Sequence, residues 1–251
     1  DKILRDLLER CNMEYDVIGK GESLVIFLHG WIAHAAQYDF VVENLDLDAF
    51  KYIFLDYRGY GKNIEKKGSY DLVELATDCC EVIKKEKCDN VILIAHSMGG
   101  LVAQKVATMQ QGKIKKIMLV APVPYDGFSF DIETRDTFLA SVSDLSIRSE
   151  IVNISTGNRL TQRWIKRFVT ASSEKIDHNA YLEYFNTWTK GFVDKSQLSQ
   201  ITSKVIIAFG EFDPVISKEL CTEKFSNVFL NSEFLELKNT GHYPMQEVPI
   251  I

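Results

Sequence analysis

Residues 91–100, Val-Ile-Leu-Ile-Ala-His-Ser-Met-Gly-Gly, join an apolar run to a serine that is flanked by small residues. A helical pattern over residues 101–107 follows directly. A buried strand that turns sharply into a helix is the context of a nucleophile elbow, where the serine hydroxyl is exposed at the end of the strand. Ala95 replaces the first glycine of the strict G-x-S-x-G pattern, but it keeps the small size that the close approach of strand and helix requires. Ser97 is therefore the candidate nucleophile.

Similar apolar runs, rich in β-branched residues, recur along the chain at 24–28, 52–55, 117–120, 205–209 and, more weakly, 234–237. Continuous hydrophobicity predicts strands that are buried on both faces, as in a parallel sheet covered by helices. Helical spacing at 73–84 and 100–109 alternates with these strands. The pattern predicts the α/β class, with a mostly parallel, doubly wound sheet. We also expect an antiparallel edge strand over 13–21 and a short helix over 3–11.

Residues 122–203 interrupt this alternation. They contain no convincing strand and several short helical patterns, for example at 160–171 and 179–190. Such a segment is too long for an ordinary connection between two strands. We expect a helical cap over 122–203, inserted into a core made of residues 1–121 and 204–251.

A serine hydroxyl is a weak nucleophile at neutral pH, so it needs a positioned base. His242 follows the last predicted strand, where a catalytic base is expected. His29, His34, His96 and His178 lie in other contexts, and we expect them to be structural or exposed.

The base in turn needs an orienting carboxylate. Glu211 and Asp213 both follow the strand predicted at 205–209. Asp213 is preferred because it precedes a proline, which favours an extended and fixed turn. Asp126, after the preceding strand, is an alternative. With Asp213, the order along the chain is serine, acid, histidine, as expected after a nucleophile elbow.

Backbone amides are expected to hold the oxyanion that forms when serine attacks a carbonyl group. Trp31 follows the strand predicted at 24–28, and Met98 follows Ser97. Their two N–H groups are the candidate oxyanion hole. The indole of Trp31 is also a candidate wall of the pocket.

Composition excludes several classes of protein. The 251 residues are 46% hydrophobic and 25% charged, with a formal net charge of −6. Proteins that bind nucleic acid usually carry an excess of basic residues, and this chain has none. No apolar run approaches the roughly 20 residues of a membrane span, and the charged segment Asp1–Arg10 lacks the core of a signal peptide. The five cysteines are odd in number and form no C-x-x-C pair, which favours reduced thiols in the cytoplasm over disulfides or a zinc site.

These motifs resemble the α/β-hydrolase superfamily, in particular its cap-bearing branch of esterases, lactonases and carbon–carbon bond hydrolases. The matching stretches are HGW at 29–31, DYRGYG at 56–61, AHSMGG at 95–100, GEFDPV at 210–215 and GHYPMQEVP at 241–249. They span almost the whole chain in the family's order. The resemblance implies the α/β-hydrolase fold, with Ser97 as nucleophile, Asp213 as acid, His242 as base, and Trp31 and Met98 as oxyanion donors.

Three positions refine the resemblance. Haloalkane dehalogenases and epoxide hydrolases carry aspartate at the nucleophile position, so Ser97 argues against both. Epoxide hydrolases also favour proline where this chain has Ile32. Family members usually continue past the histidine motif into a closing helix, whereas this chain stops at Ile251, so that either the end is trimmed or the sheet lacks one covering helix.

Aromatic residues of the predicted cap form helical stripes, one with Trp164 and Phe168 and another that includes Tyr184 and Trp188. One stripe has to pack the cap helices together, and part of the other is expected to face the substrate. Trp31, Trp164, Tyr184 and Trp188 are the candidate pocket residues.

The expected activity is hydrolysis of a carboxylic ester of a small, partly hydrophobic molecule through an acyl-enzyme. We expect no metal or organic cofactor and no nucleic-acid or membrane partner. Lactone, thioester or carbon–carbon bond hydrolysis and acyl transfer are alternatives, because the same triad serves all of them. A small-molecule receptor or scaffold with little turnover is the alternative of a different class.

Overall fold

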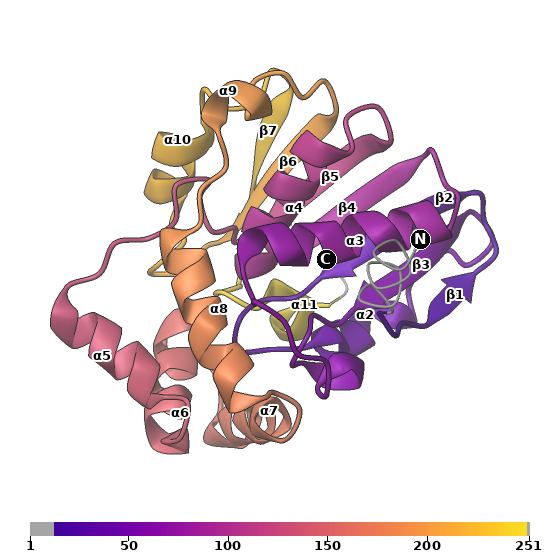
Figure 1. Ribbon diagram of the computed structural model, residues 1–251. Helices are drawn as coiled ribbons and strands as arrows, with labels where there is room; N and C mark the ends of the chain where they lie inside the picture. Colours follow the sequence, from indigo (N-terminus) through magenta and orange to yellow (C-terminus); the bar gives the residue numbers. More distant parts are fainter. Residues whose placement is uncertain (1–12, 250–251) are drawn as a thin grey trace.

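The computed structural model describes residues 13–249. One seven-stranded sheet crosses the molecule in the order β1-β3-β2-β4-β5-β6-β7 (Figure 1). Its strands are β1 (Val17–Gly19), β2 (Ser23–Leu28), β3 (Phe50–Leu55), β4 (Val91–His96), β5 (Ile114–Val120), β6 (Lys204–Gly210) and β7 (Ser232–Leu237). Only β1 is antiparallel to its neighbour. The predicted α/β class with a mostly parallel sheet is confirmed.

Helices connect the strands as the sequence pattern predicts. Helices α3 (Leu72–Lys85) and α4 (Met98–Met109) pack side by side across the front of the sheet in Figure 1. Helix α10 (Lys218–Phe225) packs on β6. The shorter elements of the core are η1 (Ala35–Tyr38), α2 (Asp39–Val42), η2 (Gly61–Asn63) and α11 (Pro244–Glu247).

The edge strand is shorter than predicted. The sequence pattern predicts a strand over 13–21, but β1 pairs with β3 over three residues only. Just before β1, the side chain of Asn63 forms hydrogen bonds with both backbone groups of Glu14. It accepts from the Glu14 N–H at 2.9 Å and donates to the Glu14 carbonyl at 3.0 Å. Those groups are therefore not available to a strand. The helix predicted over 3–11 lies outside the described residues.

The strand order places two loops together at one end of the sheet. The chain leaves β2 towards β3 on one side and leaves β4 towards β5 on the other. Loops that diverge from adjacent parallel strands open a crevice at their carboxyl ends, where ligands bind in such sheets. Leu28 and Ala95 are paired across these two strands, so the residues that follow them, including Trp31 and Ser97, emerge side by side.

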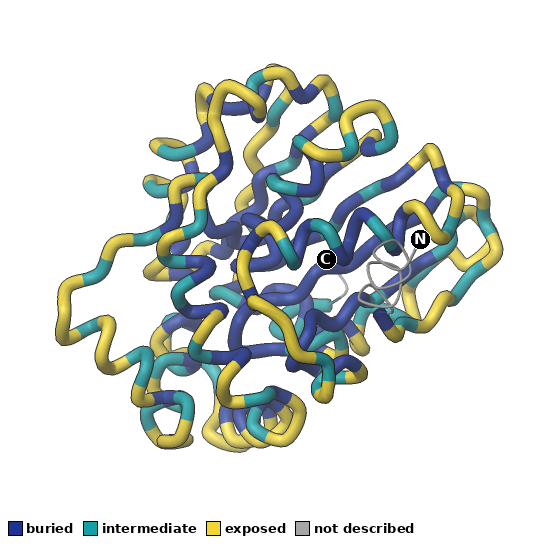
Figure 2. The backbone as a smooth tube through the Cα atoms, viewed as in Figure 1, coloured by how far each residue is buried: buried dark blue, intermediate teal, exposed yellow. Residues whose placement is uncertain are grey.

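The core of the molecule lies along the central strands. Figure 2 shows these strands as mostly buried, whereas the outer loops are exposed. Leu24, Ile26 and Leu28 of β2 are fully buried, as expected for a strand covered on both faces. Strand β7, at the edge, is mostly exposed, which accounts for its weak hydrophobic signal. Cys79, Cys80, Cys88 and Cys221 are buried free thiols.

Five helices lie between β5 and β6: α5 (Ile132–Ala140), α6 (Leu145–Ser155), α7 (Gln162–Glu174), α8 (His178–Lys190) and α9 (Lys195–Leu198). Each follows a residue whose side chain accepts a hydrogen bond from an amide of its first turn, namely Asp131, Asp144, Thr161, Asp177 and Asp194. Such N-caps are typical helix starts. Helices α5 to α8 gather at the lower left of Figure 1, beside one end of the sheet.

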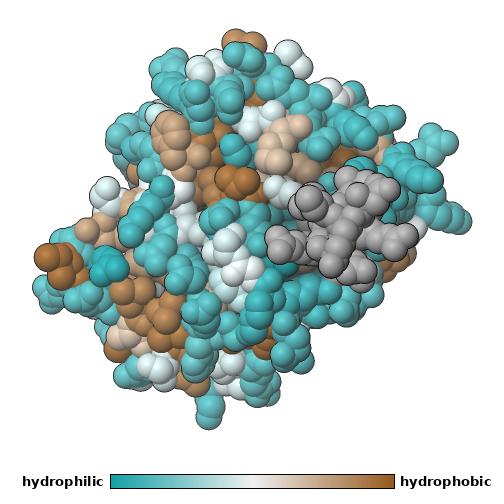
Figure 3. All heavy atoms as spheres, viewed as in Figure 1, coloured by the Kyte–Doolittle hydropathy of each residue, from teal (hydrophilic) through white to brown (hydrophobic). Residues whose placement is uncertain are grey.

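Apolar groups reach the surface near these helices. Figure 3 shows them gathered around α5 and α8, while most of the same face is hydrophilic. Among residues 13–249, no helix combines the length and the hydrophobicity that crossing a membrane requires.

Candidate active site

Ser97 lies in the sharp turn between β4 and α4. Its backbone has φ of 53° and ψ of −119°, a conformation that side-chain-bearing residues seldom adopt and that tends to mark functional sites. The Ser97 amide donates to Val120 at 3.0 Å, and the Ser97 carbonyl accepts from Gly100 at 2.8 Å and Val123 at 3.0 Å. Neighbouring backbone groups therefore hold the turn in its strained form.

Glycine is required directly after this turn. A Cβ atom at Gly99 would lie 2.6 Å from the carbonyl oxygen of Leu28 and 2.7 Å from that of His29. Both contacts are with backbone, which cannot move aside cheaply. Ala95 is fully buried. The need for small residues on both sides of Ser97, predicted from the sequence, thus has a steric cause in the contact between α4 and the end of β2.

The structure brings Ser97, Asp213 and His242 together. His242 Nε2 lies 3.0 Å from Ser97 Oγ, and His242 Nδ1 lies 2.6 Å from Asp213 Oδ2. The three residues come from the ends of β4, β6 and β7, far apart in the chain. The contacts form one continuous line from hydroxyl to imidazole to carboxylate. An imidazole with a carboxylate on one nitrogen and a hydroxyl on the other can accept the hydroxyl proton.

Backbone amides set the orientation of Asp213. Its Oδ1 atom accepts from the amides of Val215 at 2.9 Å and Ile216 at 3.0 Å, so that Oδ2 faces His242. The carboxylate side chain is fully buried.

Four alternative candidates lie elsewhere. Glu211 is exposed and accepts from a backbone amide at 3.0 Å. Asp126 forms an ion pair with Lys224 at 2.7 Å. His34 is partly buried in the loop after β2, and His178 is the exposed first residue of α8. Asp213 is thus the acid whose carboxylate meets the imidazole of His242.

Two further histidines pack behind the site. His29 Nδ1 lies 2.9 Å from the carbonyl oxygen of Gly30, and its Nε2 accepts from the amide of Tyr57 at 3.2 Å. Burial lowers the pKa of His29 to about 4, so the ring is neutral at neutral pH and donates through Nδ1–H. His96 Nε2 lies 2.7 Å from the carbonyl oxygen of His242. Both histidines hold loops of the site through these hydrogen bonds, in line with the structural role that the sequence analysis allowed for them.

The amides of Trp31 and Met98 remain available to a ligand. Within residues 13–249, neither N–H donates to a protein acceptor. The loop that bears Trp31 lies against the nucleophile, because a Cβ atom at Gly30 would come within 3.2 Å of Ser97 Cβ. Met98 is the first residue of α4, where an amide has no partner inside the helix.

A cavity of about 420 Å³ opens above these groups. Ser97 and His242 lie at its base, and its wall is mainly apolar, with Phe128, Phe130, Phe138, Ile151, Val215 and Ile216 among its residues. Helices α5, α6 and α8 all contribute side chains. The segment between β5 and β6 therefore covers the carboxyl ends of the strands.

Two of the four predicted pocket residues line this cavity, and two do not. Trp31 and Trp188 belong to its wall. Trp164 instead stacks on Phe168, with ring centroids 5.3 Å apart. Tyr184 is fully buried, and its hydroxyl donates to a backbone carbonyl at 3.0 Å. Equal helical spacing cannot show which side of a helix faces a cavity, so the aromatic pattern placed Trp164 and Tyr184 wrongly.

Glu247 is a site residue to which the sequence assigned no role. Its carboxylate accepts from the amides of Gly241 at 2.7 Å and Tyr243 at 3.0 Å, on either side of His242. Arg159 donates to the same carboxylate at 3.1 Å. Burial raises the pKa of Glu247. The sequence places Glu247 five residues after His242. Only the structure shows that its side chain folds back onto the amides of Gly241 and Tyr243.

Comparisons with known proteins identify the family and the fold of the chain. The family model described as "Serine aminopeptidase, S33" matches residues 19–228. The AB hydrolase superfamily protein YisY of Bacillus subtilis is 32% identical over 118 residues, which are 46% of this chain and 44% of that protein. A pimeloyl-[acyl-carrier protein] methyl ester esterase of Vibrio parahaemolyticus is 31% identical over 113 residues, 45% of this chain and 42% of that protein. The match thus spans less than half the length of either relative.

Solved structures resemble the fold over nearly its whole length. The esterase EaEST from Exiguobacterium antarcticum superposes with a TM-score of 0.82 at 23% identity, covering 93% of this chain and 89% of that one. A hydrolase from Oleispira antarctica gives 0.81 at 21% identity, covering 98% and 92%. At these identities the likeness shows the fold. Since the family model covers most of the chain, the protein belongs to the serine aminopeptidase S33 family of the α/β-hydrolase superfamily.

Proposed function

We propose that this protein is a serine esterase that cleaves a small, partly hydrophobic carboxylic ester through an acyl-enzyme. The observation that carries the proposal is the hydrogen-bonded line from Ser97 through His242 to Asp213 at the base of an apolar cavity. Esterase names among the relatives, such as the Vibrio parahaemolyticus methyl ester esterase, support the same class of reaction.

In the proposed first half-reaction, Ser97 Oγ attacks the ester carbonyl and its proton passes to His242 Nε2. Asp213 accepts a hydrogen bond from His242 Nδ1–H, which holds the ring in the correct tautomer and stabilises the imidazolium. The carbonyl oxygen becomes an oxyanion, and the amides of Trp31 and Met98 donate to it. His242 then protonates the leaving alcohol, and the acyl group remains on Ser97.

In the second half-reaction, a water molecule takes the place of the alcohol. His242 removes its proton, the resulting hydroxide attacks the acyl carbonyl, and the oxyanion forms again between the same two amides. Collapse of this intermediate returns the proton to Ser97 and releases the acid. Acyl transfer differs only in that another nucleophile replaces the water.

The cavity wall supports an uncharged, hydrophobic substrate. Ligand sites are mostly apolar, with a few polar groups that fix orientation. The main polar groups away from Ser97 come from α5, where Glu133, Thr134 and Thr137 line the cavity. A carboxylate such as Glu133 disfavours a second negative charge nearby. We therefore propose residues 122–203 as a cap that selects neutral acyl groups.

Replacement of Ser97 by alanine tests the nucleophile. Loss of the serine in a comparable triad costs on the order of a millionfold in turnover, so the variant is expected to show no measurable hydrolysis of p-nitrophenyl esters. A fluorophosphonate should label the wild type and not Ser97→Ala. Ser146→Ala, at an exposed serine outside the cavity, serves as the control. It should hydrolyse the esters at the wild-type rate and should still be labelled by the fluorophosphonate.

The outcomes separate the candidate functions. If Ser97→Ala retains more than about a hundredth of the wild-type rate, Ser97 is not the nucleophile. Labelling of the wild type without turnover of any ester, thioester or lactone would point to a receptor. Faster turnover of lactones than of acyclic esters would favour a lactonase.

A further inference from the structure

The peptide that carries the Trp31 amide is held from several directions. The carbonyl oxygen of the Gly30–Trp31 peptide lies 2.9 Å from His29 Nδ1. In a trans peptide the C=O and N–H groups point in opposite directions, so fixing this carbonyl also fixes the direction of the Trp31 N–H. The next carbonyl, that of Trp31 itself, accepts from the hydroxyl of Tyr60 at 2.9 Å.

The indole of Trp31 is fixed by α8. Its Nε1–H donates to the carbonyl oxygen of Tyr181 at 2.7 Å. The two rings are also stacked, with centroids 4.1 Å apart. Tyr181 is fully buried. A residue of the segment between β5 and β6 thus holds Trp31, whose amide is one of the two proposed oxyanion donors.

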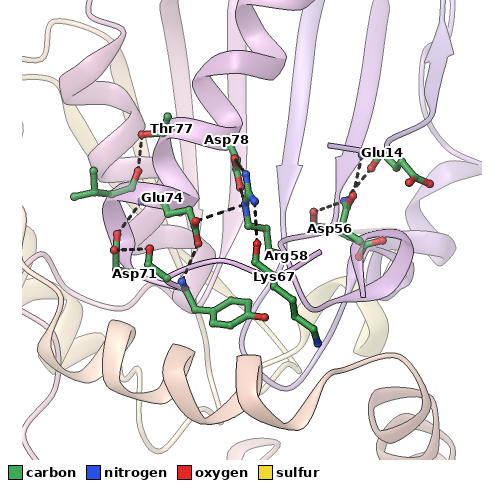
Figure 4. A network of polar contacts seen from close by, with 12 residues as sticks. Glu14, Asp56, Arg58, Lys67, Asp71, Glu74, Thr77 and Asp78 are labelled. Atoms are coloured by element: carbon green, nitrogen blue, oxygen red, sulfur yellow. Dashed lines mark hydrogen bonds and ion pairs between the residues drawn. The ribbon is translucent and has the colours of Figure 1, made fainter. Parts of the chain in front are cut away.

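Tyr60 has its own anchors in the loop after β3. Asp56 accepts from the amides of Ala35 at 2.7 Å and Lys62 at 2.9 Å. Arg58 makes two hydrogen bonds to Asp78 of α3, at 2.6 and 2.8 Å. Figure 4 shows Asp56 and Arg58 in this polar network, between the strands and α3. The loop therefore presents the Tyr60 hydroxyl from a fixed frame.

Tyr181 is anchored on its far side by Arg148. The guanidinium lies 4.4 Å from the centre of the Tyr181 ring. Arg148 is almost fully buried and donates to two backbone carbonyls and to the Ser172 hydroxyl. Ser141 Oγ lies 2.8 Å from the Tyr181 hydroxyl. A cation above an aromatic face is a favourable contact, and here it ends a stack that runs from Arg148 through Tyr181 to Trp31.

We infer that Tyr60 and Tyr181 are positioning residues for the oxyanion-binding amide of Trp31, so that α8 and the loop after β3 jointly set the rate of acyl transfer. The inference rests on the proposed function, because it concerns the same oxyanion. Removal of a single oxyanion donor costs about 10²- to 10³-fold in kcat, and a displaced donor costs part of that.

The variant Tyr60→Phe tests the inference with a matched control. It removes only the hydroxyl that donates to the Trp31 carbonyl. Tyr52→Phe removes the hydroxyl of another buried tyrosine, which donates to the Asp46 carbonyl at 3.2 Å, and Tyr52 does not line the cavity. We expect kcat to fall about 10- to 100-fold in Tyr60→Phe, with KM within about twofold of the wild type. Tyr52→Phe should keep the wild-type kcat.

A pair of inhibitors separates positioning from folding. Ser97 Oγ adds to the carbonyl of a trifluoromethyl ketone while its proton passes to His242, so the product carries an oxyanion. The methyl ketone of the same shape binds without this addition. The preference for the trifluoromethyl ketone over the methyl ketone should fall about tenfold or more in Tyr60→Phe. Trp31→Phe is a second test variant, because it removes the indole N–H that donates to the Tyr181 carbonyl. It should also lower the preference for the trifluoromethyl ketone.

The results distinguish the failure of each idea. If the wild type is active and Tyr60→Phe and Trp31→Phe both keep the wild-type preference, the positioning role is wrong. An equal loss of kcat in Tyr60→Phe and Tyr52→Phe would also overturn it, since that indicates a general effect on packing. If Ser97→Ala hydrolyses esters as fast as the wild type, the proposed function itself fails.

Discussion

The side chains of the candidate site are oriented mainly by backbone amides. One oxygen of Asp213 accepts two amides of the turn that follows it, which leaves the other oxygen for His242. Glu247 accepts the amides on both sides of His242. Glu247 thus holds the backbone on both sides of His242, while Asp213 orients its imidazole. Only one of the two touches the ring.

This difference between carboxylates gives a prediction for Asp213. We expect Asp213→Asn to lower kcat about ten-thousandfold, because the amide would favour the wrong imidazole tautomer. Glu211→Gln, two residues away at an exposed position, should stay within a few-fold of the wild type. Steady-state kinetics with a p-nitrophenyl ester measure both. A larger loss in Glu211→Gln than in Asp213→Asn would move the role of the acid to Glu211.

The triad was predictable residue by residue because each member follows a strand that its own sequence marks as buried. Ser97 and Asp213 come after such runs, His242 comes after the weaker run of the edge strand β7, and parallel strands bring their carboxyl ends to one edge. Tyr60 acts on the site through a hydrogen bond to another loop, and Glu247 through the backbone amides that flank His242. No local pattern carries such contacts, so the sequence could not assign their roles.

At the level of elements, the strands were easier to predict than the faces of the helices. A strand that is buried on both faces is apolar throughout, so it can be predicted from its own residues without knowing which elements pack against it. A helix between the sheet and solvent shows one apolar stripe. Helix α7 packs on α6, whereas α8 turns Trp188 to the cavity and buries Tyr184 away from it, so aromatic residues with the same spacing have different neighbours. Trp188 faces the cavity, whereas Trp164 stacks on Phe168.

These two tryptophans allow a matched test of the cavity wall. Trp188→Ala enlarges the cavity and should shift the preferred ester towards longer or bulkier acyl groups. Each methylene is worth about 1–3 kcal/mol in such a pocket, so the change should be graded along a chain-length series. Trp164→Ala should leave the order of preference unchanged, because its ring lies outside the cavity. If Trp164→Ala shifts the profile and Trp188→Ala does not, the assigned wall is wrong.

For the molecule as a whole, the site is the meeting point of segments from nearly every part of the chain. The loop after β2, the turn after β4, the helices between β5 and β6, and the loops after β6 and β7 all line one cavity. Folding therefore has to bury polar groups from several loops together. The histidines behind the site are the clearest example, since His29 and His96 are fully buried.

Buried neutral histidines make the stability of the fold depend on pH. Burial lowers the pKa of His29 to about 4, from the reference value of 6.5, and it also lowers the pKa of His96. Between these values the unfolded chain binds a proton that the folded chain does not. The free energy of unfolding must then fall as the pH falls through this window. From pH 7 to pH 5, His29 alone accounts for about 2 kcal/mol.

Urea unfolding at pH 7 and pH 5 measures this loss directly. His29→Gln keeps groups that can donate to Gly30 and accept from Tyr57, but it has no proton to gain. The variant should lose about 2 kcal/mol less stability than the wild type over this pH range, whatever its stability at pH 7. His178→Gln, at the exposed start of α8, should follow the wild type. An identical pH dependence in His29→Gln and the wild type would show that His29 gains its proton as readily in the folded protein as in the unfolded chain, which the hydrogen bond from the Tyr57 amide to its Nε2 does not allow.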